Sequence, residues 1–289
     1  MINHTWLGPN GDLINMSDTG AGVWMTDGGI EGMGNPPTTP FTRLSPFVAG
    51  QTLTGFSTGP RSVFWPVAID AGIRSWVENQ ARFWDSLIPG EFGTWTVSRD
   101  GSPRTLECRF ESDGGKPYEF DPSQRGIEVA GVTLTADKPF WRGPHVSKLF
   151  QQAQSSGTFY APSGSTHVFN IGSAGNTDAA VLSNPGDVPA WPLITISGPS
   201  VAFSVTVDDA EISATLSLAS GDRLVIDTDP TQQMARLWRG GVSTLFPFFN
   251  FTQIRFAPIP RGGSVPIAIT VNGSGPVEIG FYPQYRRAF

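Results

Sequence analysis

The chain has 289 residues and a mass of 31.0 kDa, a length that favours two domains over one. It contains 34 Gly and 25 Pro, and only 15% of its residues are charged while 39% are hydrophobic, which argues against a mostly helical fold and against a disordered chain. The formal net charge of −6 leaves no basic surplus to displace counterions from a nucleic acid, so nucleic-acid binding is not the expected task.

Neither a signal sequence nor a long apolar segment is apparent, so we expect a soluble chain made in a cytoplasm, without a membrane span. The single cysteine, Cys108, cannot form an internal disulfide, so folding has to rest on packing. Its 20 Phe and nine Trp supply large apolar area, and together with so many turn formers they favour short strands in sandwiches or barrels.

The first sixty residues are rich in turn formers, such as Gly28-Gly29 and Pro36-Pro37, and predict no regular element. A strand is predicted over 62–69, where apolar residues alternate. Because Pro66 cannot donate a ladder hydrogen bond, this strand is expected at a sheet edge or at a bulge.

One helix is predicted, over 71–87, ended by Pro89-Gly90. Trp76, Phe83 and Trp84 fall on one stripe of this helix. We interpret the stripe either as core or as a surface that faces a partner.

A hairpin follows the helix, with strands around 95–97 and 106–110 and a turn at Asp100-Gly101. Another strand, 127–134, leads into the Pro- and Gly-containing segment 136–143. We therefore place a domain boundary near Gly143 and expect domains at 1–143 and 144–289.

The second half predicts an antiparallel β-sandwich, because short alternating segments are separated by turn signals such as Asn272-Gly273. The segment 246–251 is too apolar for a free loop, so Phe246 and Phe248 are expected inside the sandwich or against a neighbouring chain. The predicted strands are 166–171, 193–197, 201–207, 211–218, 223–227, 235–238, 253–256, 266–271 and 277–282.

Residues for catalysis or metal binding are hard to assemble from this sequence. His4, His145 and His167 stand far apart without partners at ligand spacing, and Cys108 alternates with apolar residues as a small buried hydrophobe would. No Gly-x-Ser-x-Gly pentapeptide occurs, and the acidic pairs Asp208-Asp209 and Asp227/Asp229 lie beside turns, where Asp caps backbone groups. We predict no catalytic, cofactor-binding or metal-binding residues.

Four segments, 93–106, 136–143, 184–196 and 217–230, resemble those of siphophage distal tail proteins, including the minor tail proteins of phages of actinobacteria. The resemblance implies an N-terminal split β-barrel like that of tail-tube proteins, called a belt domain, with one α-helix, and a C-terminal galectin-like β-sandwich. It further implies a non-enzymatic virion protein at the distal end of the tail, in a homohexameric ring. The implied partners are the major tail tube protein, the tail hub protein, and receptor-binding or fibre proteins, with DNA passing through the lumen unbound.

Ring formation agrees with two features of the chain. A split barrel leaves strand edges open, and a head-to-tail ring covers them. The chain has only three Lys, the residue that commonly keeps exposed strand edges from pairing with other chains, so edges covered by a ring suit this sequence. The candidate interface residues are Trp76, Phe83, Trp84, Phe246 and Phe248. The alternatives are a carbohydrate-binding adhesin of the virion that uses Trp191 or Trp238, and a glycoside hydrolase, which would need two carboxylates at one cleft.

Overall fold

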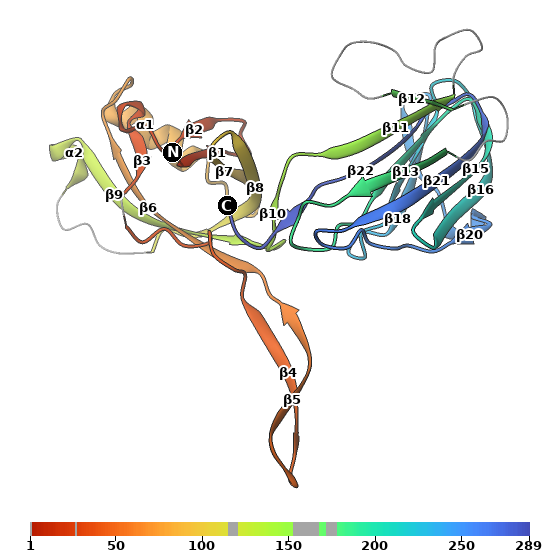
Figure 1. The fold of residues 1–289 in the computed structure, drawn as a ribbon. Coiled ribbons are helices and arrows are strands. Elements are labelled where there is room, and N and C mark those ends of the chain that lie inside the picture. The colour runs from red at the N-terminus through yellow and green to blue at the C-terminus, as the bar shows by residue number, and fades with distance from the viewer. Residues whose placement is uncertain (1, 27, 115–120, 153–167, 172–177) are drawn as a thin grey trace. The chain divides into compact units, whose positions relative to one another are not determined.

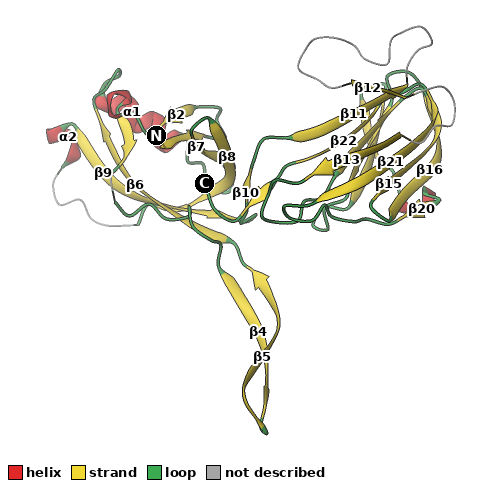
Figure 2. Cartoon of the chain, in the orientation of Figure 1, coloured by secondary structure: helices red, strands yellow, loops and turns green. Residues whose placement is uncertain are grey.

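The computed structural model describes the chain except for residues 1, 27, 115–120, 153–167 and 172–177 (Figure 1). The described residues are mainly in strands, with a few short helices (Figure 2), which confirms the predicted mainly β fold. They form two compact units, Met1–Gly143 with Tyr285–Phe289 and Pro144–Gln284. Within the described residues, no helix has the length and apolar character needed to cross a membrane.

The first unit is built on a nearly closed, barrel-like sheet with the strand order β2-β1-β7-β8-β9-β6-β3. β10 pairs with β8 and with β23. The predicted hairpin is β7 and β8, and its turn residues Asp100 and Gly101 have φ values of 52° and 81°, as two-residue hairpin turns require. The strands of this sheet are β1 (Ile2–Leu7), β2 (Leu13–Asn15), β3 (Val23–Met25), β6 (Arg61–Asp70), β7 (Phe92–Arg99), β8 (Ser102–Ser112), β9 (Ile127–Ala136), β10 (Trp141–Arg142) and β23 (Gln284–Tyr285).

Four tryptophans from four strands fill the centre of this unit. Trp6, Trp65, Trp95 and Trp141 are all buried, and successive ring centroids lie 5.1, 5.4 and 4.9 Å apart. The rings meet edge-on or tilted, the geometry that aromatic quadrupoles favour. Each ring removes roughly 150–250 Å² from water, so the Trp content explains how a barrel of this size is stabilised without a disulfide.

The predicted helix is α1 (Trp76–Asp85), shorter than the expected 71–87. Ser75 and Glu78 form a capping box that starts the helix, and Gly72 lies too close to the backbone of 20–22 to leave room for a side chain. Phe83 and Asn79 point into the unit and are buried. The other short helices are η1 (Thr19–Ala21), α2 (Pro122–Arg125) and η2 (Phe248–Asn250).

β6, the strand predicted at 62–69, is not an edge strand. It pairs along its length with β9, and β3 covers Val67–Ile69 on its other side. Pro66 is tolerated because β3 ends beside it: the Pro66 carbonyl accepts a hydrogen bond from Thr26 N at 2.8 Å, just past the last paired residue. In an antiparallel strand, the N and O of one residue point to the same neighbouring strand. The N–H that Pro66 lacks would therefore point towards β3, just beyond the last paired residue, so no hydrogen bond between β3 and β6 is lost.

The last five residues belong to the first unit, although the predicted boundaries placed them with the second. The Ala288 N–H donates to the Met33 carbonyl at 3.0 Å, and Arg104 Nη1 donates to the Arg287 carbonyl at 2.8 Å. The Arg104 guanidinium also lies 3.6 Å from the centre of the Tyr285 ring. These are contacts between segments far apart in sequence, and no local pattern announces them.

The second unit is a β-sandwich of two sheets. One has the order β12-β11-β22-β14-β17-β18-β19 and the other β13-β21-β15-β16-β20. The strands are β11 (Val146–Gln152), β12 (Val168–Ile171), β13 (Asp178–Ser183), β14 (Leu193–Ser197), β15 (Ser200–Val207), β16 (Ala210–Leu218), β17 (Arg223–Asp227), β18 (Met234–Arg239), β19 (Val242–Leu245), β20 (Gln253–Ile254), β21 (Ser264–Gly273) and β22 (Val277–Phe281).

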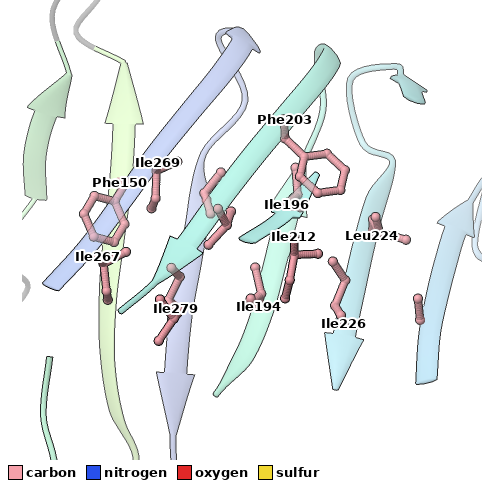
Figure 3. Packing of buried hydrophobic residues seen from close by; sticks show 14 of the residues in the cluster. Phe150, Ile194, Ile196, Phe203, Ile212, Leu224, Ile226, Ile267, Ile269 and Ile279 are labelled. Atoms are coloured by element: carbon pink, nitrogen blue, oxygen red, sulfur yellow. The ribbon is translucent and has the colours of Figure 1, made fainter. Parts of the chain in front are cut away.

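The sandwich core consists of alternating apolar residues from both sheets (Figure 3). Ile194 and Ile279, adjacent in one sheet, face the same interior as Ile267 and Phe203 from the other, and all four are buried. The period-2 alternation read from the sequence therefore marks the inward face of each strand.

Candidate assembly interface

The five interface candidates from the sequence differ in how much of each side chain is accessible. Phe83 is fully buried in its own unit, so this candidate is wrong: no partner reaches it in the folded chain. Trp76 and Trp84 are half-buried and pack against the core of the first unit. Phe246 and Phe248 are likewise partly exposed, packed against the sandwich core through the Phe251 ring, with centroids 5.2 and 6.0 Å away.

The described residues that were considered for catalysis or metal binding have structural surroundings. Among the described residues no three His, Cys, Asp or Glu side chains gather as metal ligands, and His167 lies outside them. Cys108 is fully buried, and burial raises the pKa of its thiol well above the usual value. Asp227 Oδ1 accepts the Asp229 N–H at 3.0 Å, so this acidic pair shapes a turn, as predicted.

The two tryptophans considered for carbohydrate stacking are both half-buried. The Arg223 guanidinium lies 4.7 Å from the centre of the Trp238 ring and covers it. This side chain therefore already has a stacking partner, and the structure gives no support for a sugar site at Trp238.

Several strongly exposed apolar residues lie together on a hairpin that the sequence did not predict. Among the strands that the structure describes, β4 (Thr38–Ser45) and β5 (Val48–Thr58) pair only with each other, as the separate two-stranded ribbon in Figure 1. All eight residues of β4 are exposed. The segment 32–60 carries a single charged residue, Arg43. An isolated two-stranded hairpin has little stability of its own, so this one needs something to pack against.

One face of the hairpin is apolar because of a β-bulge. Leu53 and Phe56 are three residues apart and would point to opposite faces of a regular strand. The register shifts between Phe41 and Thr42, so that Leu53 lies opposite Thr42 and Phe56 opposite Pro40. Both side chains then share one face with Pro40 and Leu44, while Phe41 and Arg43 lie on the other.

This face and the turn leave a large apolar area in water. Leu44 is 74%, Leu53 62% and Phe56 61% exposed, and Phe47 in the turn is 95% exposed. With roughly 150–250 Å² for each large side chain, these four leave on the order of 500 Å² uncovered. Patches of that size mark interaction sites on soluble proteins, whereas single exposed apolar residues do not.

Arg61 anchors the base of the hairpin. The side chain is only 2% exposed and donates to four carbonyls: Pro139 at 2.7 Å, Gly32 at 2.6 Å, Gly34 at 2.5 Å and Arg286 at 2.7 Å. Burial lowers its pKa to about 10, so the guanidinium stays protonated at neutral pH. Gly32 and Gly34 precede β4, and Arg61 follows β5, so one side chain holds both ends of the hairpin in place.

The sequence did hold a signal for this hairpin. β-branched residues are enriched in strands, and six Thr lie in two runs around a turn with Pro46 and Gly50. The six are Thr38, Thr39, Thr42, Thr52, Thr54 and Thr58. The Gly-rich segment before them masked the pattern.

No protein-family model and no curated protein sequence matches the chain. Among solved structures it is similar to the Dit protein of SPP1, described as a paradigm of the hub adsorption apparatus in phages that infect Gram-positive bacteria. The TM-score is 0.61 at 12% identity, over 98% of this chain and 99% of that one.

It is also similar to a chain of the phage P2 baseplate in its activated conformation with Ca, with a TM-score of 0.56 at 12% identity over 100% of this chain and 99% of that one. A P2 baseplate chain with Sr gives 0.50 at 10% identity, over 93% and 98%. Over nearly its whole length, in both units, this chain has the fold of the phage Dit protein.

Proposed function

We propose that this chain is a structural virion protein of a phage tail tip, a distal tail protein that forms a ring between the tail tube and the hub. The observation that carries the proposal is the anchored, apolar and uncovered β4–β5 hairpin, because an exposed apolar area of this size marks a surface for another chain. The whole-length fold similarity to a hub protein and to baseplate chains supports the place of assembly.

In this proposal the first unit builds the ring, which we take to be a homohexamer, and the second unit is the docking platform. The partners are the major tail tube protein, the hub protein and receptor-binding or fibre proteins. DNA passes through the lumen without specific binding, because each copy adds a formal charge of −6 and an acidic ring repels phosphates. The chain acts by assembly and has no chemistry of its own.

Light scattering after size-exclusion chromatography, combined with negative-stain microscopy, tests the proposal. The wild type is expected to form rings whose population grows with protein concentration. Phe56→Ser, on the apolar face of the hairpin, is expected to shift the chain to monomers. Phe41→Ser is the matched control, because Phe41 is exposed to a similar extent, 53%, on the opposite face. A wild type that stays monomeric at every concentration, with no rings in the images, would overturn the proposal.

A further inference from the structure

A second uncovered apolar surface lies on α1 and the turn before it. Ile73 is 83% and Val77 62% exposed, and Ala81 is exposed as well. Val77 and Ala81 are one turn apart on the same side of α1, and Ile73 lies in the turn just before the helix. Half-buried Trp84 lies beside Val77 and Ala81 on the helical wheel, so the apolar face of α1 is wider than its own unit covers. We call Ile73, Val77 and Ala81 the helix stripe.

The stripe is held rigidly and points away from the core. α1 buries Asn79 and Phe83 on another side, and Asn79 Nδ2 donates to the Asp70 carbonyl at 2.8 Å. Arg82 fixes the opposite flank through the Leu13 carbonyl at 2.6 Å. Because these contacts fix the rotation of the helix, the stripe is a preformed surface that needs no rearrangement before a partner binds.

We infer that the helix stripe receives the apolar face of the β4–β5 hairpin from a second copy of this chain. This inference rests on the proposed ring. A head-to-tail ring needs two different surfaces on each copy, one that fits the other, whereas a two-fold dimer pairs one surface with itself. The hairpin face and the helix stripe are both uncovered in the first unit and differ in shape, one a strand pair and the other a helix side with the turn before it.

Both surfaces are short, and both lack charge. Val77 to Ala81 span about 6 Å along the helix at 1.5 Å per residue, and Ile73 lies in the turn before the helix. Pro40 to Leu44 on the hairpin spans about 13 Å at 3.3 Å per residue. Neither row contains a charged residue, and Arg43 lies on the other face of the hairpin, so the contact buries no unpaired charge.

Charges on the helix lie at the border of the stripe. Arg74, in the turn before α1, and Glu78 and Asp85, on the helix, are exposed; Asp85 lies one turn beyond Ala81, and Glu78 also serves the capping box. A contact with an apolar centre and such a polar rim has the usual arrangement of a specific protein interface. The pattern favours a protein surface over a lipid surface, because acidic side chains at the rim are repelled by anionic lipids.

The experiment is a complementation of two assembly-defective variants. Leu53→Glu places a carboxylate on the apolar face of the hairpin and keeps the helix stripe intact. Val77→Glu places a carboxylate on the helix stripe and keeps the hairpin intact. Each alone is expected to weaken self-association at least about 100-fold, because an unpaired carboxylate enters an apolar contact. Mixed one to one, they form a heterodimer through the one intact pair of surfaces, and assembly stops there. Phe41→Glu, on the opposite hairpin face, and Asp85→Ala, one turn beyond the stripe, are the controls, which still assemble.

Disulfide trapping gives an independent readout. Leu53→Cys mixed with Val77→Cys is expected to give a covalent heterodimer, while buried Cys108 does not react. If the wild type forms rings but the two Glu variants do not complement each other, or if Leu53→Cys copies couple only with themselves, the inference is overturned and the proposed ring stands. If the wild type forms no rings and the Cys pair does not couple, both fail.

Discussion

Replacing Arg61 by Met tests how the base of the hairpin is held. Met keeps the length and apolar stem of the side chain but removes every donor, which leaves the carbonyls of Gly32, Gly34, Pro139 and Arg286 without this partner. A buried carbonyl that loses its donor costs about 1 kcal/mol or more. Gly34 and Arg286 are exposed, so their carbonyls can bond water instead, and Gly32 keeps a bond from Trp141 Nε1 at 3.3 Å. We therefore expect a loss of about 2 kcal/mol in the free energy of unfolding of the first unit.

Tryptophan fluorescence during urea unfolding measures this loss. Of the nine tryptophans only Trp191 and Trp238 lie in the second unit, so the signal reports mainly on the first. Arg109→Met is the control, because Arg109 forms an exposed ion pair with Asp137 at 3.2 Å and is expected to change stability by less than about 1 kcal/mol. If Arg61→Met shifted the unfolding free energy no more than the control, the carbonyl cluster would not be what holds these segments together.

Three further predictions concern single buried residues. Burial lowers the pKa of His4 below its ordinary value of 6.5, so the unfolded chain binds the proton more readily than the folded one, and folding stability is lost as the pH falls through 6.5. The His4→Phe variant should therefore show a flatter pH dependence of its unfolding free energy between pH 7 and 5. Equal slopes for variant and wild type would contradict this. Burial also raises the pKa of the Cys108 thiol, so its reaction with maleimide should be slow in the native protein and fast in urea. Mass spectrometry detects the labelled protein. Fast labelling of the native protein would show that the thiol is accessible. The Asn184 side chain is buried and hydrogen-bonds the Val188 carbonyl, the Ile259 carbonyl and the Gly186 N–H. Asn184→Ala should therefore lower the unfolding free energy of the second unit by about 2–3 kcal/mol, measured by calorimetry. A change under about 0.5 kcal/mol would show that these hydrogen bonds do not stabilise the unit.

Part of the proposed assembly surface could be predicted from local sequence patterns and part could not. Trp84, a predicted interface residue, borders the helix stripe. Ile73 and Val77 were not predicted, because single exposed aliphatic residues are common on protein surfaces and do not indicate an interface. Leu53 and Phe56 share a face only through a bulge whose position depends on the partner strand. A spacing of three residues in one strand therefore gives no warning of an apolar face.

Local chemistry by itself determined the fold class and many elements. Period-2 alternation marked the inward residues of β15 and β16, Asp100-Gly101 marked a hairpin turn, and the alternation around Cys108 marked a buried thiol. These features depend on neighbours within a few residues, so the sequence carries them directly.

Only the tertiary structure decided which distant segments meet. The carbonyls around Arg61 come from segments before β4, after β9 and at the C-terminus, and β6 lies inside its sheet because β3 returns to pair with it. Backbone carbonyls have no side-chain signature, and strand order depends on long-range pairing, which local composition does not encode. For the same physical reason, the sequence does not show that the β4–β5 hairpin stays outside the sheet of the first unit, which pairs its own described strands without it.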